Sequence, residues 1–220
     1  MVIPALDEAG QIAGAIRSAQ VRDEDIEILV VDGGSRDATA ARAKAEGADV
    51  LVGAPGRARQ LDAGWRAARG DVLVFLHADS RLGRGWSRAL RTALEDEDVA
   101  GGAFRLRFDD RSAGMRLIEW GTRLRVALFG LPYGDQAIFV RRRVLESLGG
   151  IPDVRLMEDL DLVAGVKRRG RLAALEVEVT TSARRYARAG VLRTLAAHSV
   201  ALASWRLGLS RERVARWAGR

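Results

Sequence analysis

The stretch VLVFLHAD occupies residues 72–79 and decides the fold. Its apolar run is too short to span a membrane and is typical of a strand buried on both faces of a sheet. In an open α/β sheet, ligands bind just beyond the carboxyl ends of such strands. Asp79 is therefore a candidate ligand for a metal or a substrate. The alternative is that Asp79 or Ser80 simply caps the following helix.

Strand and helix patterns alternate through the first hundred residues. Short apolar runs predict buried strands, and apolar residues spaced three and four positions apart predict helices. Repeated alternation of this kind predicts an α/β fold with a mostly parallel, doubly wound sheet. We expect strands over 1–5, 27–32, 49–52 and 72–77, and helices over 9–20, 37–47, 56–68 and 86–94.

The second half of the chain has a different pattern. Residues 101–108 alternate apolar and basic side chains, which indicates a strand with one solvent-facing surface. Acids open the helix expected after residue 157, where they complement the helix dipole. We expect further strands over 137–140 and 172–181, and helices over 112–129, 157–169, 191–207 and 210–218.

The composition is that of one globular domain: 220 residues, of which 48% are hydrophobic. Cysteine is absent, which excludes disulfides, a thiol nucleophile and a zinc–thiolate site. No apolar window reaches the length of a membrane-spanning helix, and no signal peptide is recognisable. We therefore expect a cytoplasmic protein.

The net charge of +7 is concentrated at the end of the chain. Residues 184–220 hold nine arginines and one acid, which suits an anionic partner or a solvated helix face. Within this block, 191–207 combines basic and apolar residues, as a helix on an anionic membrane surface does. The alternatives are packing on the rest of the domain and a homodimer contact. No recognition motif accompanies the charge, so we expect no nucleic-acid partner.

Acids follow three of the four strands expected in the first half, namely Glu8, Asp32 and Asp79. Carboxylates along one edge of a sheet repel one another unless a cation or a donor-rich ligand lies among them. The glycines after Asp32 also leave room for a phosphate or a nucleoside, although no GxGxxG or P-loop motif is present. The sequence therefore predicts a ligand site at this edge.

Six motifs in order give the chain its family resemblance. It resembles the family 2 glycosyltransferases, which have the nucleotide-sugar-binding GT-A fold, and most of all a small bacterial subgroup with HAD in place of DxD. The resemblance implies a three-layer α/β/α sandwich with C-terminal helices. The motifs are VIPALDE at 2–8, VVDGGSRDAT at 30–39, GRARQLDAG at 56–64, GDVLVFLHAD at 70–79, YGDQAIFVRR at 133–142 and MEDLDL at 157–162.

The same resemblance implies how the chain is divided. Residues 1–190 would form the GT-A glycosyltransferase domain, with a nucleotide-binding half over 1–100 and an acceptor-binding half over 101–190. Residues 191–220 would form a basic and apolar C-terminal helical extension. Such an extension on the inner face of a membrane would suit a lipid-linked acceptor.

The resemblance also assigns the donor site. Asp79 matches the last acid of the DxD motif, which binds the Mg²⁺ or Mn²⁺ that bridges the donor diphosphate. His77 replaces the first acid of that motif and is not assigned as a metal ligand. Asp62 stands where asparagine is commoner, which puts a diphosphate contact by Asp62 in doubt. The expected donor-binding residues are Pro4, Leu6, Glu8, Asp32, Gly34, Arg59, Ala78 and Asp79.

The acceptor side carries the expected catalytic residue. Asp159 matches the acid that acts as general base, and Glu158 and Asp161 are rival bases. One base opposite the leaving group gives inversion at the anomeric carbon. Residues expected in the acceptor or diphosphate region are Asp135, Gln136, Glu158, Arg184 and Arg185.

We therefore expect an inverting, divalent-cation-dependent, hexosyltransferase-like enzyme. It would move a sugar from a UDP-sugar, or as second choice a GDP-sugar, to a hydroxyl acceptor. One alternative is a nucleotidyltransferase, which usually needs a basic, glycine-rich loop where LDEAG stands at 6–10. The other is a non-catalytic nucleotide-sugar-binding module, against which the intact Asp32, Asp79 and Asp159 argue.

Overall fold

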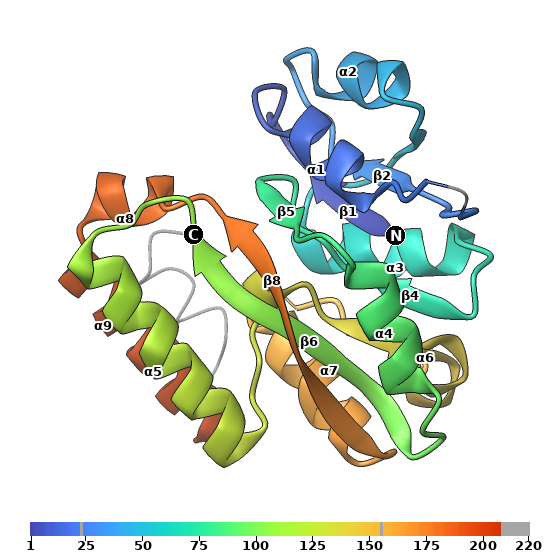
Figure 1. The fold of residues 1–220 in the computed structure, drawn as a ribbon. Helices are drawn as coiled ribbons and strands as arrows, with labels where there is room; N and C mark the ends of the chain where they lie inside the picture. Colours follow the sequence, from blue (N-terminus) through green and yellow to red (C-terminus); the bar gives the residue numbers. More distant parts are fainter. Residues whose placement is uncertain (23, 155, 208–220) are drawn as a thin grey trace.

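The structure is a computed structural model that describes residues 1–22, 24–154 and 156–207 (Figure 1). A parallel sheet begins the chain, with strands β1 (Val2–Ala5), β2 (Leu29–Asp32) and β3 (Asp49–Val52). Ala5 pairs with Asp32, so the loops that follow β1 and β2 leave from the same edge of the sheet.

Helices cover both faces of this sheet because its residues alternate in direction. Ile3 and Val30 face α1 (Ile12–Ala19) and α2 (Thr39–Ala45) on one side. Val2 and Val31 face α3 (Arg57–Ala67) on the other. The α/β/α layers expected from the sequence are confirmed.

The stretch VLVFLHAD at residues 72–79 joins the first sheet to the rest of the molecule. After β4 (Val72–Val74), Phe75 pairs in parallel with Val2, and the Leu76 N–H donates to the Val2 carbonyl at 3.0 Å. On its other side β4 pairs with β7 (Phe139–Arg141), which is antiparallel. The order continues from β7 to β6 (Val99–Phe108), β8 (Arg171–Thr181) and β5 (Ser80–Leu82). The strand order is therefore β3-β2-β1-β4-β7-β6-β8-β5.

Two long strands carry the second half. They are β6 (Val99–Phe108) and β8 (Arg171–Thr181), which pair in parallel and cross the molecule beside each other (Figure 1). Their irregular register places bulges between Val99 and Gly101 and between Ala103 and Arg105. Helices α6 (Arg142–Leu148) and α7 (Glu158–Lys167) also belong to this half.

Several elements differ from the expectation. The short strand β5 (Ser80–Leu82) follows Asp79 directly, and α4 (Trp86–Leu94) begins only after Gly85. The alternative of a helix cap at Asp79 or Ser80 is therefore wrong. Helix α1 begins at Ile12 rather than at residue 9, and Asp7, which precedes it, takes a left-handed conformation with φ of 54°.

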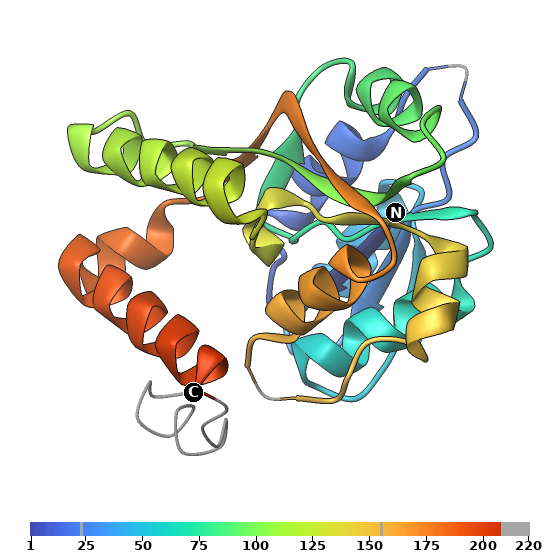
Figure 2. The same ribbon diagram turned by 90° about the horizontal axis from the view of Figure 1, so that it is seen from below.

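One helix from the middle of the chain and two from near its end form an arm. Helix α5 (Ala113–Phe129) begins at Ser112, whose hydroxyl accepts a hydrogen bond from the Met115 N–H. Helices α8 (Arg184–Ala189) and α9 (Val191–Arg206) return beside α5, and both long helices project from the body of the molecule (Figure 2). The helix expected over 210–218 lies outside the described residues. None of the helices in the described part of the chain is long and apolar enough to cross a membrane.

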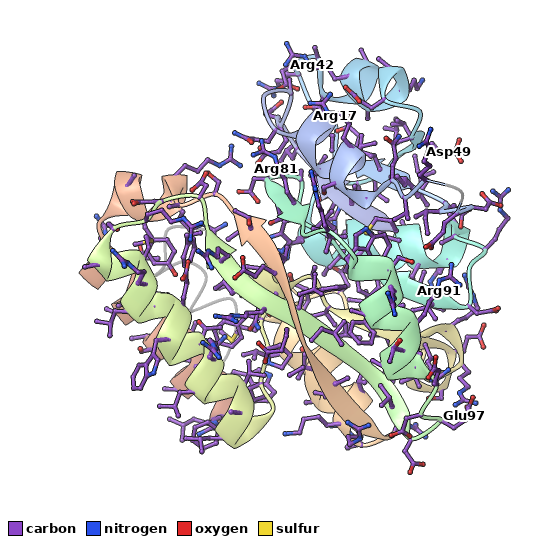
Figure 3. All side chains as sticks on the ribbon, in the orientation of Figure 1. Arg17, Arg42, Asp49, Arg81, Arg91 and Glu97 are labelled. Carbon is purple, nitrogen blue, oxygen red and sulfur yellow. The ribbon has the colours of Figure 1, made fainter. Side chains whose placement is uncertain are left out.

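Much of the arginine charge lies on the outer surface of the first half. Arg17 pairs with Glu46, and Arg91 Nη2 lies 3.0 Å from Glu24 Oε2. Arg17, Arg42 and Arg91 point outward around α1, α2 and α4 (Figure 3). Exposed pairs of this kind contribute little to stability, so their arginines are ordinary surface residues.

Candidate active site

The loops after β1 and β2 are tied together by backbone hydrogen bonds. The Asp7 N–H donates to Ser35 Oγ at 2.9 Å, and the Arg36 N–H donates to Asp7 Oδ1 at 2.8 Å. The Glu8 N–H donates to Thr39 Oγ1 at 2.8 Å. These bonds explain the unusual backbone of Asp7 and hold Glu8 beside the end of β2.

Asp32 ends β2 and is 5% exposed. Its Oδ1 accepts hydrogen bonds from the Ser35 N–H at 2.9 Å and the Ser35 hydroxyl at 2.6 Å. The resulting turn passes through Gly34, whose φ of 91° favours glycine. The other carboxylate oxygen has no hydrogen-bond partner among the described residues, so it can accept from an N–H or O–H of a ligand.

An arginine from α8 joins two of the predicted acids. Arg184 Nη2 pairs with Glu8 Oε1 and lies 3.2 Å from Asp79 Oδ2. The hydrogen bond to Glu8 and the charge of Asp79 raise the pKa of Arg184, although partial burial opposes this. Glu8 Oε2 is buried and has no hydrogen-bond partner among the residues that the structure describes. Three residues that are far apart in sequence thus form one cluster at the edge of the sheet.

This cluster fits a divalent cation that arrives with a diphosphate. Mg²⁺ is commonly held by one or two carboxylates together with substrate phosphates. Asp79 and the unpartnered Oε2 of Glu8 supply hard oxygen ligands of that kind. Within residues 1–22, 24–154 and 156–207, no three His, Cys, Asp or Glu side chains gather into a complete metal cage. A cation here would therefore need oxygens from its substrate.

A second cluster lies at the start of α7. Arg57 Nε pairs with Glu158 Oε1, and Arg57 Nη2 lies 3.4 Å from Asp159 Oδ2. Asp159 Oδ2 accepts a hydrogen bond from the Gly134 N–H at 2.8 Å, and its Oδ1 accepts from the Leu160 N–H at 2.9 Å. Met157, with φ of 65°, is the residue that precedes the helix and makes no side-chain cap. Asp159 therefore links α7 to the 134–136 turn.

His77 borders the second cluster. A Cβ placed on Gly134 would lie 3.2 Å from His77 Nε2, 2.7 Å from Arg57 Nη2 and 3.3 Å from Asp159 Oδ2. Burial and the positive charges of Arg57 and Arg185 hold the pKa of His77 well below 6.5. The imidazole is therefore neutral near neutral pH. Only glycine at position 134 leaves room for these side chains.

Asp135 and Gln136 behave differently although they are neighbours in the 3₁₀ turn η1 (Gly134–Gln136). The Gln136 side chain is fully used: its Oε1 accepts from the Tyr133 N–H, and its Nε2 donates to the Phe104 carbonyl. Asp135 Oδ1 is buried and has no hydrogen-bond partner within residues 1–22, 24–154 and 156–207. Burial raises the pKa of Asp135, and Arg125 opposes the rise. Gln136 thus has a structural role, whereas Asp135 keeps an unused oxygen.

Some expected site residues make contacts of other kinds. Arg59 pairs with Asp153 at 2.9 Å on the surface, and Asp161 accepts a hydrogen bond from Trp205 Nε1 at 2.8 Å. Pro4 and Ala78 are buried, Leu6 is exposed, and Arg185 is exposed near the site. Of these, Leu6 and Arg185 can reach a ligand without rearrangement.

Asp62 also makes structural contacts. It accepts hydrogen bonds from Arg66 Nε at 2.8 Å, Trp65 Nε1 at 2.7 Å and the Ile151 N–H at 3.0 Å. Asp62 thus ties α3 to the loop after α6.

Three aromatic and basic residues, namely Arg125, Tyr133 and Tyr186, belong to the site although they were not expected as site residues. The Arg125 guanidinium stacks 3.4 Å from the centre of the Tyr133 ring. Burial raises the pKa of Tyr186 to about 12, and Asp135 adds to the rise. Arg125 comes from α5 and Tyr186 from α8, so only the tertiary structure brings them to Asp135.

Comparison with known proteins gives consistent matches. The family model described as "Glycosyl transferase family 2" matches residues 1–149. Glucosyl-3-phosphoglycerate synthase of Mycolicibacterium paratuberculosis is 39% identical over 90 residues, which cover 36% of this chain and 27% of that protein. The chain thus matches about a quarter of the length of this curated relative.

Solved structures extend the similarity over most of the chain. The glucosyl-3-phosphoglycerate synthase of Mycobacterium tuberculosis, in complex with Mn²⁺, UDP and glucosyl-3-phosphoglycerate, is 25% identical with a TM-score of 0.58. That match covers 80% of this chain and 68% of the other. Residues 1–349 of TarS from S. aureus share the fold, with 13% identity, a TM-score of 0.63 and coverage of 83% and 59%.

Proposed function

We propose a donor, a cation and a reaction for this chain, which belongs to glycosyl transferase family 2. It transfers a sugar from a UDP-sugar to a hydroxyl acceptor, with inversion and with Mg²⁺ or Mn²⁺. UDP-glucose is the first candidate donor, because the mycobacterial synthase has been crystallised with UDP-glucose and Mn²⁺. A GDP-sugar is the second.

The bridge formed by Arg184 between Glu8 and Asp79 is the observation that carries this proposal. The arginine and the two carboxylates place positive and negative charge within a few ångströms of each other, which suits a ligand that itself carries both charges. A diphosphate with a divalent cation presents that combination, since its oxygens are anionic and its counterion is cationic. When bound, the cation that Asp79 and Glu8 would hold neutralises the charge developing on the diphosphate leaving group.

The chain's own residues have separate tasks in the reaction. The free carboxylate oxygen of Asp32 accepts a hydrogen bond from the base or the ribose. Arg184 turns from the acids to the diphosphate. Asp159 takes the proton of the acceptor hydroxyl while the acceptor oxygen bonds to the anomeric carbon and the bond to the diphosphate breaks. Attack from the face opposite the leaving group inverts the configuration.

Arg57 and Gly134 position the proposed base. The Gly134 N–H and Arg57 Nη2 both contact Oδ2 of Asp159, and each carboxylate oxygen has two lone pairs. These contacts fix the orientation of the Asp159 carboxylate and still leave it a lone pair that can accept a proton. The neutral His77 adds no competing positive charge beside it. Glu158 is engaged by Arg57 and Asp161 by Trp205, which favours Asp159 among the three acids.

The division into a donor half over 1–100 and an acceptor half over 101–190 remains part of the proposal. Donor contacts come from the loops after β1, β2 and β4, and the proposed base comes from α7. A nucleotidyltransferase is disfavoured, because the loop after β1 places Glu8 where that class needs a basic residue.

A thermal-shift panel tests the donor assignment directly. UDP, GDP, CMP and dTDP are each added with and without Mn²⁺, and we expect UDP with Mn²⁺ to raise the melting temperature most. No shift with any nucleotide, in folded protein, would contradict the proposal. Release of UDP from UDP-glucose in the presence of an acceptor then separates an enzyme from a non-catalytic binding module.

We also propose that the helical arm contacts the inner face of an anionic membrane in the cytoplasm. Trp120 and Leu128 are 60% and 65% exposed on α5, and α5 and α9 together carry five arginines against one acid. Amphipathic, basic surfaces of this kind bind anionic bilayers. Co-sedimentation with vesicles containing phosphatidylserine tests this, with neutral vesicles as the control. A concentration-dependent dimer without vesicle binding would instead assign the surface to a second copy.

A further inference from the structure

A cavity of about 360 Å³ is lined by residues of both α5 and α9. These two helices project from the body of the molecule (Figure 2). Its size falls in the range of small-molecule sites. Most of its wall is apolar and comes from three separate elements. The residues that form this apolar wall are Leu106, Leu117, Ile118, Trp120, Leu195 and Leu202.

One end of this cavity is polar. Tyr133, Asp135, Tyr186 and Arg125 line it together. Asp135 contributes a buried Oδ1 that has no hydrogen-bond partner in the part of the chain that the structure describes. A buried acceptor without a partner destabilises the protein until a donor reaches it. The tyrosines and the arginine do not provide that donor, although they surround the carboxylate.

The polar end adjoins the proposed base. Asp135 directly follows Gly134, whose N–H donates to Asp159 Oδ2 at 2.8 Å. Arg57 and Arg185 are the other charged neighbours of Asp135, besides Asp159 and Arg125. A molecule in the cavity therefore reaches the second cluster of the candidate site at one end and apolar side chains along its length.

We propose that this cavity is the acceptor site, and that the acceptor is an alcohol with an apolar body whose hydroxyl donates a hydrogen bond to Asp135. The inference rests on the proposed function and names the acceptor class for the same site. Burial of the apolar body against α5 and α9 supplies the binding free energy. In the bound state the single hydroxyl proton is hydrogen-bonded to Asp135. As the acceptor oxygen attacks the anomeric carbon, the hydroxyl turns toward Asp159 and this proton passes to the Asp159 carboxylate.

The acceptor class differs from that of the mycobacterial synthase, whose structure contains phosphoglyceric acid. A small polyanion would leave the apolar wall of this cavity in contact with water. An apolar alcohol covers that wall and needs only one polar partner. The two acceptor classes therefore give opposite expectations for the dependence of transfer on acceptor chain length.

Direct binding comes first, because it does not depend on the donor. 1-Decanol is titrated into the full chain while tryptophan fluorescence is followed, since Trp120 lines the cavity. We expect a saturable change in the wild type and a loss of affinity of about tenfold in Gly121→Leu. Gly121 also lines the cavity, and no atom lies within 4 Å of the position of its Cβ, so the added side chain enters open space.

The matched control is Ala127→Leu. Ala127 lies on the same helix and is exposed, and it is not part of the cavity wall. It adds similar bulk elsewhere, so we expect wild-type affinity for 1-decanol. Equal losses in Gly121→Leu and Ala127→Leu, or no saturable binding by the wild type, would overturn the proposal.

Transfer from UDP-glucose completes the test. With primary alcohols from butanol to decanol, we expect kcat/KM to rise roughly threefold for each added methylene. Transfer to 3-phosphoglycerate but to none of the alcohols would overturn the acceptor class and leave the donor proposal intact. Conversely, saturable decanol binding without any response to UDP and Mn²⁺ would refute the proposed function and leave the cavity as an apolar binding site.

Discussion

Two surfaces of the molecule differ in their chemistry. One is the carboxyl edge of strands β1, β2 and β4, and the other is the arm formed by helices α5 and α9. At the sheet edge, every predicted acid is close to a donor: Asp32 to Ser35, and Glu8 and Asp79 to Arg184. On the arm, large apolar side chains such as Leu117 and Leu128 are about two-thirds exposed, at 66% and 65%. One surface is organised around charge and the other around apolar area.

The difference indicates what each surface can bind. Carboxylates held by rigid strands and tight turns keep their positions without a ligand, which suits a substrate whose charges must be matched at fixed distances. Exposed apolar side chains on helices are stabilised when they are covered. Fixed charge at the sheet edge and uncovered apolar surface on the arm therefore suggest a polar donor and an apolar acceptor or surface.

The largest expected effect is at the sheet edge. Asp79→Ala removes the carboxylate expected to contact the cation, so we expect transfer to fall roughly a thousandfold or more. Addition of Mn²⁺ should no longer strengthen UDP binding in a calorimetric titration. Asp49→Ala is the matched control, because Asp49 is an exposed acid at the opposite end of β3. Persistence of the Mn²⁺ effect in Asp79→Ala would contradict the metal assignment.

The next comparison separates two acids that lie where the two surfaces meet. Asp159→Asn should lower kcat by about a hundredfold or more, since a general base contributes that much, and should leave UDP affinity unchanged. Asp135→Asn should act mainly on the KM of the alcohol acceptor, because Asp135 holds the hydroxyl without taking its proton. Steady-state kinetics with both substrates varied measures this. If Asp135→Asn lowered kcat by this factor and Asp159→Asn did not, Asp135 would be the base and Asp159 the residue that holds the hydroxyl.

A pair of core and arm variants tests whether the two regions differ in packing. Ile16 is 0% exposed against the first sheet, so Ile16→Ala should lower the free energy of unfolding by about 3 kcal/mol. Leu128→Ala on the arm should change it by less than about 0.5 kcal/mol, since surface substitutions rarely do more. Urea denaturation measures both. A large loss in Leu128→Ala would mean that the arm is already covered in solution.

The smallest expected effect concerns a structural carboxylate. Partial burial opposes ionisation of Asp62, but hydrogen bonds from Arg66, Trp65 and the Ile151 N–H outweigh it and hold its pKa below 3.8. A depressed folded-state pKa stabilises the protein above the ordinary pKa, and the contribution is lost as the pH falls below it. Asp62→Asn should therefore lower the free energy of unfolding by about 1 kcal/mol at pH 7.

The pH dependence provides the control for this last variant. Below pH 4 the stabilities of Asp62→Asn and the wild type should converge, because the wild-type carboxylate then becomes protonated. UDP affinity should be unchanged throughout, since Asp62 contacts the loop after α6 rather than the donor edge. A constant stability difference from pH 3 to pH 7 would show that ionisation of Asp62 is irrelevant to its role.

Local patterns predicted the first half of the chain well because its strands are short apolar runs between turns, and β1, β2 and β4 are largely buried. Strand β3 has the expected bounds, and β2 and α3 lie within the segments predicted for them. The short strand β5 was missed because Ser80–Leu82 contains a charged residue and only one large apolar residue. Helix α8 was missed because its arginine-rich sequence has no apolar periodicity.

The candidate site was predictable only in part. Asp32 and Asp79 follow strands, so sheet topology alone places them on one edge. The pairing of Arg57 with Glu158 and that of Arg184 with Glu8 join residues 101 and 176 positions apart. No local pattern encodes such distant contacts. The sequence also does not reveal that Asp135 Oδ1 lacks a hydrogen-bond partner among the described residues, because this depends on where neighbouring donors lie in the folded protein.

The amino-acid sequence by itself determined the family, the α/β alternation and the acids at the sheet edge, because these depend on short-range order and strand direction. Only the tertiary structure decided that Asp79 is not a helix cap, that Gln136 is structural and that α5 and α9 enclose a cavity. Burial, charge pairing and exposed apolar area are properties of surfaces in contact, and those surfaces exist only after the chain has folded.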